Sequence, residues 1–154
     1  MGFSVSAATA VIFAGLFLAL GIFYPAMVNS YERVQAADAD QADRALEQAN
    51  TDIRLDDATS AGGGGGNRLE VTLTNTGSTS LTVSETDVVV DGTYIQRSEL
   101  DTTVTDVDNN DDSTTDLWLP GETLDITYNP AGQFNGDRVR VVTEHGVAVS
   151  GAIN

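Results

Sequence analysis

The sequence predicts an α+β protein, in which a single N-terminal transmembrane and stalk helix precedes an all-β immunoglobulin-like sandwich. Three observations support this fold class. No charged side chain occurs from Phe3 to Val28, five glycines stand in a row at residues 62–66, and apolar and polar residues alternate from Arg68 onward. We therefore expect a helix over residues 1–57, a Gly-rich linker over residues 58–67 and a β-sandwich over residues 68–154.

The first part of the predicted helix, about residues 3–28, has the composition of a membrane span. A helix rises 1.5 Å per residue, so this stretch is long enough to cross a hydrocarbon layer of about 30 Å. A secretory signal peptide would have a basic segment before a shorter apolar run and a small-x-small cleavage site after it. Neither feature is present, so we expect an uncleaved single-pass anchor. Because a large acidic region follows, we expect the C-terminal side to be extracytoplasmic.

Beyond the span, the sequence predicts an amphipathic stalk that ends near Asp57. Its apolar residues recur at mostly helical spacing: Tyr31, Val34, Ala42, Leu46, Ala49 and Ile53. The stripe is thin, which fits either packing against another helix or a solvated stalk. Within the span, the pairs Ala10/Ala14 and Gly15/Ala19 have the small-xxx-small spacing that lets membrane helices approach closely.

The glycine run marks the boundary of the predicted stalk. Glycine destabilises a helix by about 1 kcal/mol relative to alanine, and Gly-rich segments behave as flexible tethers. A phosphate-binding loop would need Gly-Lys-Ser/Thr at the start of a helix, whereas Asn67 and Arg68 follow here. The run is therefore interpreted as a linker.

The remaining residues predict six or seven short strands joined by turns. Leu69, Val71 and Leu73 alternate with polar residues, as do Leu124, Ile126 and Tyr128. Asp91-Gly92 and His145-Gly146 are each expected to form the turn of a hairpin. Trp118 is expected to be the central aromatic residue of the core.

The charge composition is strongly acidic. The chain has 23 acidic and 7 basic residues, all of them arginine, and a net charge of −16. Molar salt reduces the Debye length to about 3 Å and screens the resulting repulsion, so we interpret the chain as halophilic. Nucleic acid is excluded as a partner, because its binding depends on Lys and Arg at phosphates. No cysteine is present, which excludes disulfides and thiolate chemistry.

No catalytic constellation is evident, and we expect the protein not to be an enzyme. His145 is interpreted as a turn residue. Asp106, Asp108 and Asn110 match the first three ligand positions of an EF-hand, but Asp111 replaces its glycine and Leu117 its final glutamate. The cluster from Asp106 to Asp116 is interpreted as a solvated loop, with a loose cation site left open. We therefore assign no catalytic, cofactor-binding or metal-binding residues and no cofactor.

The opening stretch "MGFSVSAATAVIFAGLFLALGIFYPAMVNSYERVQAA" resembles the haloarchaeal archaellum protein F family, FlaF or ArlF, with its type IV pilin-like N-terminal helix. The stretches "LTNTGSTSLTVSETDVVVDGTY" and "WLPGE" also fit this family. The resemblance implies a membrane-anchored stator of the archaellum (the archaeal flagellum) in swimming motility. It implies binding to the S-layer protein and to the companion archaellum protein G, in the pseudo-periplasm beneath the S-layer. Self-association is left open.

Two alternatives remain. The first is a filament-forming archaellin or type IV pilin-like subunit. Archaellin precursors resemble one another in a basic leader, whereas only Met1 and Gly2 precede Phe3 here, and N-glycosylation sequons are absent. The second alternative is a surface-tethered binding module, which would be expected to expose aromatic residues in a groove.

Overall fold

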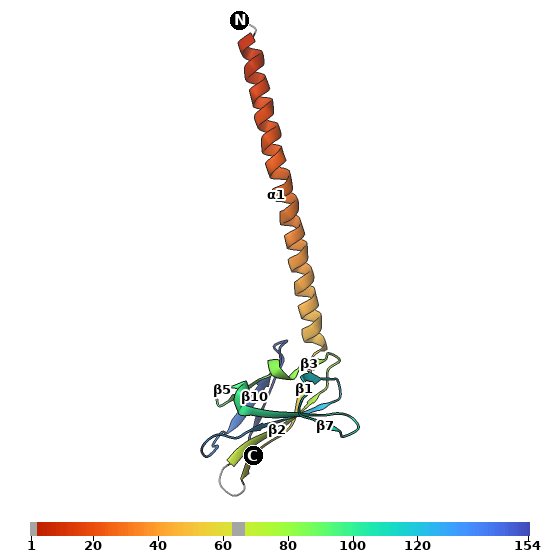
Figure 1. Ribbon diagram of the computed structural model, residues 1–154, viewed down its shortest axis with the longest axis vertical. Coiled ribbons are helices and arrows are strands. Elements are labelled where there is room, and N and C mark those ends of the chain that lie inside the picture. Colours follow the sequence, from red (N-terminus) through yellow and green to blue (C-terminus); the bar gives the residue numbers. More distant parts are fainter. Residues whose placement is uncertain (1–2, 63–66) are drawn as a thin grey trace. The chain divides into compact units, whose positions relative to one another are not determined.

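The chain consists of one long helix and an antiparallel β-sandwich, seen in a computed structural model that describes residues 3–62 and 67–154 (Figure 1). It divides into two compact units, Met1–Asp43 and Arg44–Asn154. The last residues of the helix belong to the second unit, together with all of the strands.

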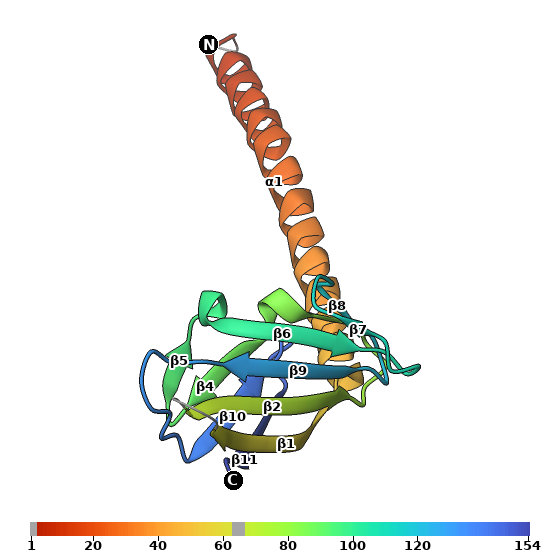
Figure 2. The ribbon, with the colours of Figure 1, turned by 60° about the horizontal axis from the view of Figure 1, so that its bottom comes forward.

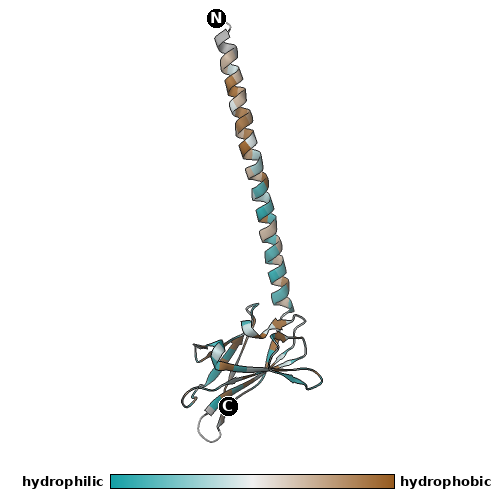
Figure 3. Ribbon diagram, in the orientation of Figure 1, coloured by the Kyte–Doolittle hydropathy of each residue, from teal (hydrophilic) through white to brown (hydrophobic). Residues whose placement is uncertain are grey.

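Helix α1 extends over Phe3–Asn50 and is continuous across Pro25. Hydrophobic residues are concentrated in its N-terminal part and hydrophilic residues in the remainder (Figure 3). The buried residue Thr51 ends the helix: its backbone N–H donates to the carbonyl of Gln48, and its hydroxyl donates to the carbonyl of Glu47 at 2.7 Å. These bonds satisfy carbonyls that a helix end leaves without partners.

The predicted helix boundary at Asp57 is wrong, because the next residues form strand β1 (Ile53–Gly62). Ile53 pairs with Asn75 and is only 5% exposed. Pairing with a distant strand and burial in the core outweigh the local helical spacing of Ile53.

The predicted linker over residues 58–67 is also revised. Residues 58–62 belong to β1, and Asn67 begins β2, with Gly62 opposite Asn67 in the register. Residues 63–66 lie outside the described residues. The sandwich therefore begins at Ile53 rather than at Arg68, and the glycine run lies between two paired strands.

Two sheets form the sandwich, and all strand pairs are antiparallel (Figure 2). The first has the order β1-β2-β9-β6-β7, and the second has the order β11-β10-β4-β5. Strands β3 and β8 form a separate two-stranded pair. The described residues thus form eleven strands, more than the six or seven expected. The remaining bounds are β2 Asn67–Asn75, β3 Leu81–Thr82, β4 Asp87–Val90, β5 Thr93–Ile95, β6 Leu100–Thr105, β7 Asp111–Asp112, β8 Leu117–Trp118, β9 Thr123–Tyr128, β10 Arg138–Val142 and β11 Ala148–Ala152.

Alternating side chains of the two sheets build the core. Leu69, Val71 and Leu73 are buried as predicted, and Trp118 has no exposed surface. Tyr128, by contrast, is only partly buried and packs edge-on against Phe134. The prediction of an immunoglobulin-like sandwich after an apolar helix is confirmed.

Both predicted hairpin turns are present. Asp91 and Gly92 have φ angles of 47° and 83°, as a two-residue hairpin turn between β4 and β5 requires. Gly146, with φ of 77°, closes the turn between β10 and β11 by donating to the carbonyl of Thr143. The C-terminus covers part of the edge of β1, because Asn154 exchanges backbone hydrogen bonds with Ala58 and Ser60.

Candidate interaction surfaces

The apolar part of α1 exposes its large side chains on every side. Among its exposed residues, Phe17 and Ile22 have exposed fractions of 72% and 76%. By length and composition the helix could cross a membrane. Water contact over so much apolar surface is unfavourable, so this segment needs lipid or other helices around it. The exposed large hydrophobic residues here are Val11, Ile12, Phe13, Leu16, Phe17, Leu18, Leu20, Ile22, Phe23 and Tyr24.

The helix-packing hypotheses concern the same element. A Cβ added at Gly15 would meet nothing within 4 Å. Tyr31 and Val34 of the predicted stalk stripe are also exposed. Packing of either stripe against a partner helix therefore stays a prediction.

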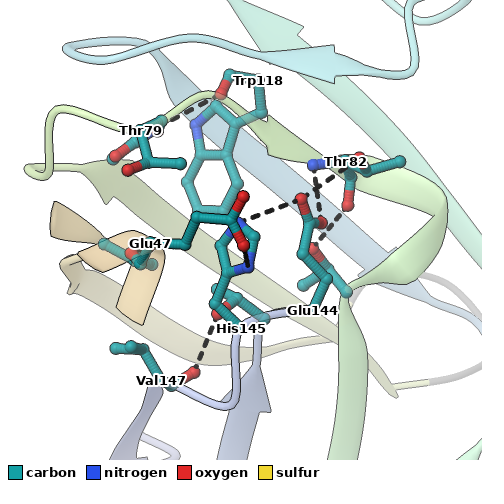
Figure 4. Close-up of polar contacts among 11 residues, drawn as sticks. Glu47, Thr79, Thr82, Trp118, Glu144, His145 and Val147 are labelled. Atoms are coloured by element: carbon teal, nitrogen blue, oxygen red, sulfur yellow. Dashed lines mark hydrogen bonds and ion pairs between the residues drawn. The ribbon is translucent and has the colours of Figure 1, made fainter. Parts of the chain in front are cut away.

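His145 lies in the β10–β11 turn, as predicted, where it meets the last turns of α1 (Figure 4). Its Nδ1 lies 3.7 Å from a carboxylate oxygen of Glu47, and its Nε2 lies 3.6 Å from one of Glu144. The other oxygen of Glu144 accepts the backbone N–H of Thr82 at 2.8 Å. The histidine side chain is 18% exposed. The cluster therefore joins the helix end, the hairpin and β3, which is a structural role.

The sequence could not reveal the contact between Glu47 and His145, because the two residues are far apart in the chain. The signal that could have revealed this contact is the position at which the helix ends. Once α1 ends at Asn50, Glu47 falls in its last turn, close to the first strand of the sandwich.

Several carboxylates of the acidic loop from Asp106 to Asp116 accept hydrogen bonds from other residues of the chain. Asp106 accepts the N–H groups of Asp108 and Asn110 and the side-chain amide of Asn110, at 2.8–2.9 Å. Hydrogen bonds from Asn110 and Asp108 hold the pKa of Asp106 below its usual value. The three residues that match an EF-hand thus bond to one another. Among the described residues, no group of three or more His, Asp or Glu side chains is arranged to hold a metal ion.

Two other carboxylates of the loop also accept hydrogen bonds, Asp112 from within the loop and Asp116 from the distant Ser84. Asp112 accepts the N–H and hydroxyl of Thr114, and these bonds lower its pKa. Asp116 accepts the hydroxyl and N–H of Ser84, and with Arg97 nearby they lower its pKa as well. Leu117 and Leu119 lie exposed beside these acids and help to line a hollow of about 380 Å³. The loop is therefore an ordered acidic surface with apolar residues at its border.

The described residues thus combine an apolar N-terminal helix with an antiparallel β-sandwich. A family model for archaeal-type flagellin matches residues 2–151. This match includes both the helix and the sandwich. The chain therefore belongs to the archaeal-type flagellin family.

Solved structures with partial similarity include archaellum stator proteins and a glycosidase. The archaellum periplasmic stator protein FlaG from Sulfolobus acidocaldarius is 20% identical, with 66% of this chain and 97% of that chain covered and a TM-score of 0.45. A chain of the FlaF–FlaG stator complex from the same organism is 19% identical, with 64% and 85% covered and a TM-score of 0.44. A GH20 β-N-acetylglucosaminidase from Vibrio harveyi is 10% identical, with 66% and 17% covered and a TM-score of 0.34. No curated protein matched the chain. Since these three TM-scores are below 0.5, the family assignment rests on the family model alone.

Proposed function

We propose that this chain is a non-enzymatic, membrane-anchored component of the archaellum, which acts as a stator and binds the S-layer in swimming motility. The observation that carries the proposal is the uncharged stretch from Phe3 to Val28, which is helical throughout and exposed over residues 7–28, in a chain of the archaeal-type flagellin family. An apolar helix of this length supports insertion in a bilayer. The acidic sandwich then supplies a folded unit that can contact proteins outside the cell.

In this proposal the helix crosses the cell membrane once, and the sandwich lies beneath the S-layer at the base of the archaellum. Its partners are the S-layer protein and the companion archaellum protein G, the latter supported by the resemblance of the opening stretch to the protein F family. Rotation of a filament requires a fixed element that takes up the reaction torque. A membrane anchor linked to the outer lattice provides such an element.

The second candidate is a filament subunit, an archaellin or type IV pilin-like protein. The flagellin family match favours it, and so does the exposure of apolar side chains around α1, because helices packed in a filament core would cover the same surface. The two candidates therefore differ in what surrounds α1, which is lipid in the first and copies of the same helix in the second.

Fractionation of the host cells distinguishes the candidates. Filaments are sheared from the cells in molar KCl, and the chain is quantified by mass spectrometry in filaments and in washed membranes. The stator proposal predicts the chain in membranes and not in filaments, with Met1 or Gly2 at its N-terminus. Abundance in filaments with Phe3 as the first residue would instead establish the filament subunit. The major filament protein of the same preparation serves as the control for complete shearing.

A further inference from the structure

The outer face of the sheet β11-β10-β4-β5 carries an unusual set of side chains. Val139 and Val141 of β10 point into the core and are fully buried, so Arg138 and Arg140 project from the opposite face of the strand. Across the sheet, Arg140 lies opposite Val89 and Ser150, and Val89 lies opposite Tyr94. We call the surface formed by Val89, Tyr94, Arg138, Arg140 and Ser150 the arginine face.

This face is accessible and partly concave. Tyr94 is 54% exposed, and both arginines are exposed. A hollow of about 410 Å³ is lined by Val89, Asp91, Gly92, Arg138, Arg140 and Ser150. The face therefore offers apolar contact area beside two guanidinium groups, the residue types that protein interfaces favour.

Neither guanidinium has a hydrogen-bond or ion-pair partner among the described residues. Asp91, which lines the same hollow, accepts the backbone N–H groups of Asp137 and Arg138, both at 3.0 Å. Two positions apart on one strand, the two arginines are separated by about 7 Å between Cα atoms. In a chain with 23 acidic residues and 7 basic ones, two neighbouring exposed arginines form a locally positive surface that can receive carboxylates of a partner.

Two arginines of the other sheet, unlike Arg138 and Arg140, form ion pairs within the chain. There Arg54 pairs with Asp56, and Arg68 pairs with Glu70. Another acid of that sheet, Asp125, accepts a hydrogen bond from the hydroxyl of Thr72 at 2.6 Å. The two outer faces of the sandwich thus differ, because Arg54 and Arg68 are ion-paired, whereas Arg138 and Arg140 have no such partner among the described residues.

We propose that the arginine face docks a protein surface rich in carboxylates, with Arg138 and Arg140 each donating to a carboxylate of the partner. A guanidinium matches a carboxylate in bidentate geometry, which makes a short, charge-assisted contact. Molar salt screens long-range attraction, but charge pairs that become buried in an interface are screened much less. This assignment rests on the function proposed above. The partner that docks on the arginine face is the S-layer protein, which contacts Val89 and Tyr94 as well as the two arginines.

Binding of the full-length chain to S-layer protein tests the proposal. The chain in detergent is titrated onto immobilised S-layer protein from the host cells, in molar KCl. The double variant R138Q/R140Q is compared with R54Q/R68Q, which removes the same charge from the other sheet. We expect at least about tenfold weaker binding for R138Q/R140Q and less than about twofold for R54Q/R68Q. Unchanged fluorescence of Trp118 shows that each variant keeps its fold.

The other outcomes separate the docking proposal from the proposed function. If both variants bind like wild type, the arginine face is not the docking surface, although S-layer binding stands. An equal loss in both variants would indicate a net-charge effect and also overturn the proposal. If the wild-type chain does not bind S-layer protein, the proposed function fails, and the docking proposal fails with it. Sedimentation of the chain alone identifies the competing occupant, since self-association that R138Q/R140Q abolishes would assign the face to a second copy.

Discussion

The side-chain amide nitrogen of Asn75 lies 3.2 Å from the main-chain carbonyl oxygen of Trp118, 43 residues further along the chain. The same amide donates to the carbonyl of Thr79 at 2.9 Å, and its oxygen accepts the N–H of Gly77 at 3.1 Å. Asn75 has no exposed surface. One buried side chain thus joins the end of β2 to the turn that follows it and to β8.

We expect Asn75→Ala to lower the free energy of unfolding by about 2–4 kcal/mol. The substitution leaves buried backbone groups without partners, and each such group costs about 1–3 kcal/mol. Denaturant unfolding of the full chain, followed by the fluorescence of its single tryptophan, measures the change. Asn135→Ala, at an exposed position, is the control and should change stability by less than about 0.5 kcal/mol. Equal stabilities of the two variants would contradict this role of Asn75.

Gly77 lies against the segment that follows α1. A Cβ at this position would be 2.6 Å from both the carbonyl oxygen of Asn50 and the backbone nitrogen of Asp52. Gly77 also donates its N–H to the carbonyl of Asp52 at 2.9 Å. Because both neighbours are backbone atoms, Gly77→Ala should force the turn away and lower the free energy of unfolding by about 1–3 kcal/mol.

Gly132→Ala is the matched control for Gly77→Ala. A Cβ at Gly132 would meet nothing within 4 Å, so its substitution should be neutral or stabilise the fold by up to about 1 kcal/mol. Thermal unfolding in molar KCl compares the two variants. A Gly77→Ala protein as stable as Gly132→Ala would show that the turn is not held against the residues after α1.

The sandwich could be predicted from sequence where burial follows a simple period. Leu69, Val71 and Leu73 alternate with polar residues, and that alternation alone places one face of β2 in the core. Asp91-Gly92 is a turn for an equally local reason, since both residues need positive φ. The spacing of Ile53 predicts a helix, but it fits both the helical period and the two-residue period of a strand. Only its pairing with Asn75, which depends on a distant strand, decides between them.

Whether a candidate surface can be predicted from the sequence depends on whether its residues are neighbours in the chain or are brought together by distant strand pairing. The acidic loop is contiguous in sequence, so the sequence reveals it, although the sequence does not predict its hydrogen bonds. The arginine face combines residues of four strands, so the cross-strand register is needed to bring Tyr94, Val89 and Arg140 together. The local signal that could have identified it is the alternation Arg138-Val139-Arg140, which places two charges on one side of a strand.

Ser84→Ala should raise the pKa of Asp116 toward its usual value of 3.8. The Ser84 hydroxyl donates to the Asp116 carboxylate at 2.8 Å and stabilises its charged form. A lowered folded-state pKa contributes stability that is present above the unfolded-state pKa and is lost as the pH falls through the folded-state value. The stability difference between wild type and Ser84→Ala should therefore be constant above about pH 5 and shrink below about pH 4.

Carboxyl-carbon NMR titration of the full chain measures the pKa of Asp116 directly. Ser113→Ala is the control, because it removes an exposed hydroxyl from the same loop without removing a hydrogen bond to Asp116. An Asp116 pKa that is the same in wild type and Ser84→Ala would show that the backbone N–H of Ser84 and the charge of Arg97 account for the shift without the hydroxyl.

Leu20→Arg should release the chain from membranes. Leu20 lies within the uncharged stretch of α1 and is 53% exposed, so the stator proposal places it in lipid. An arginine near the centre of a span opposes insertion by about 2.5–3.5 kcal/mol. Val34→Arg introduces the same charge at an exposed position beyond the span and should leave the chain in the membrane fraction. The measurement is the amount of chain retained in membranes after an alkaline wash. Retention of both variants would show that residues 3–28 do not hold the chain in the bilayer, and release of both would point to a general loss of folding.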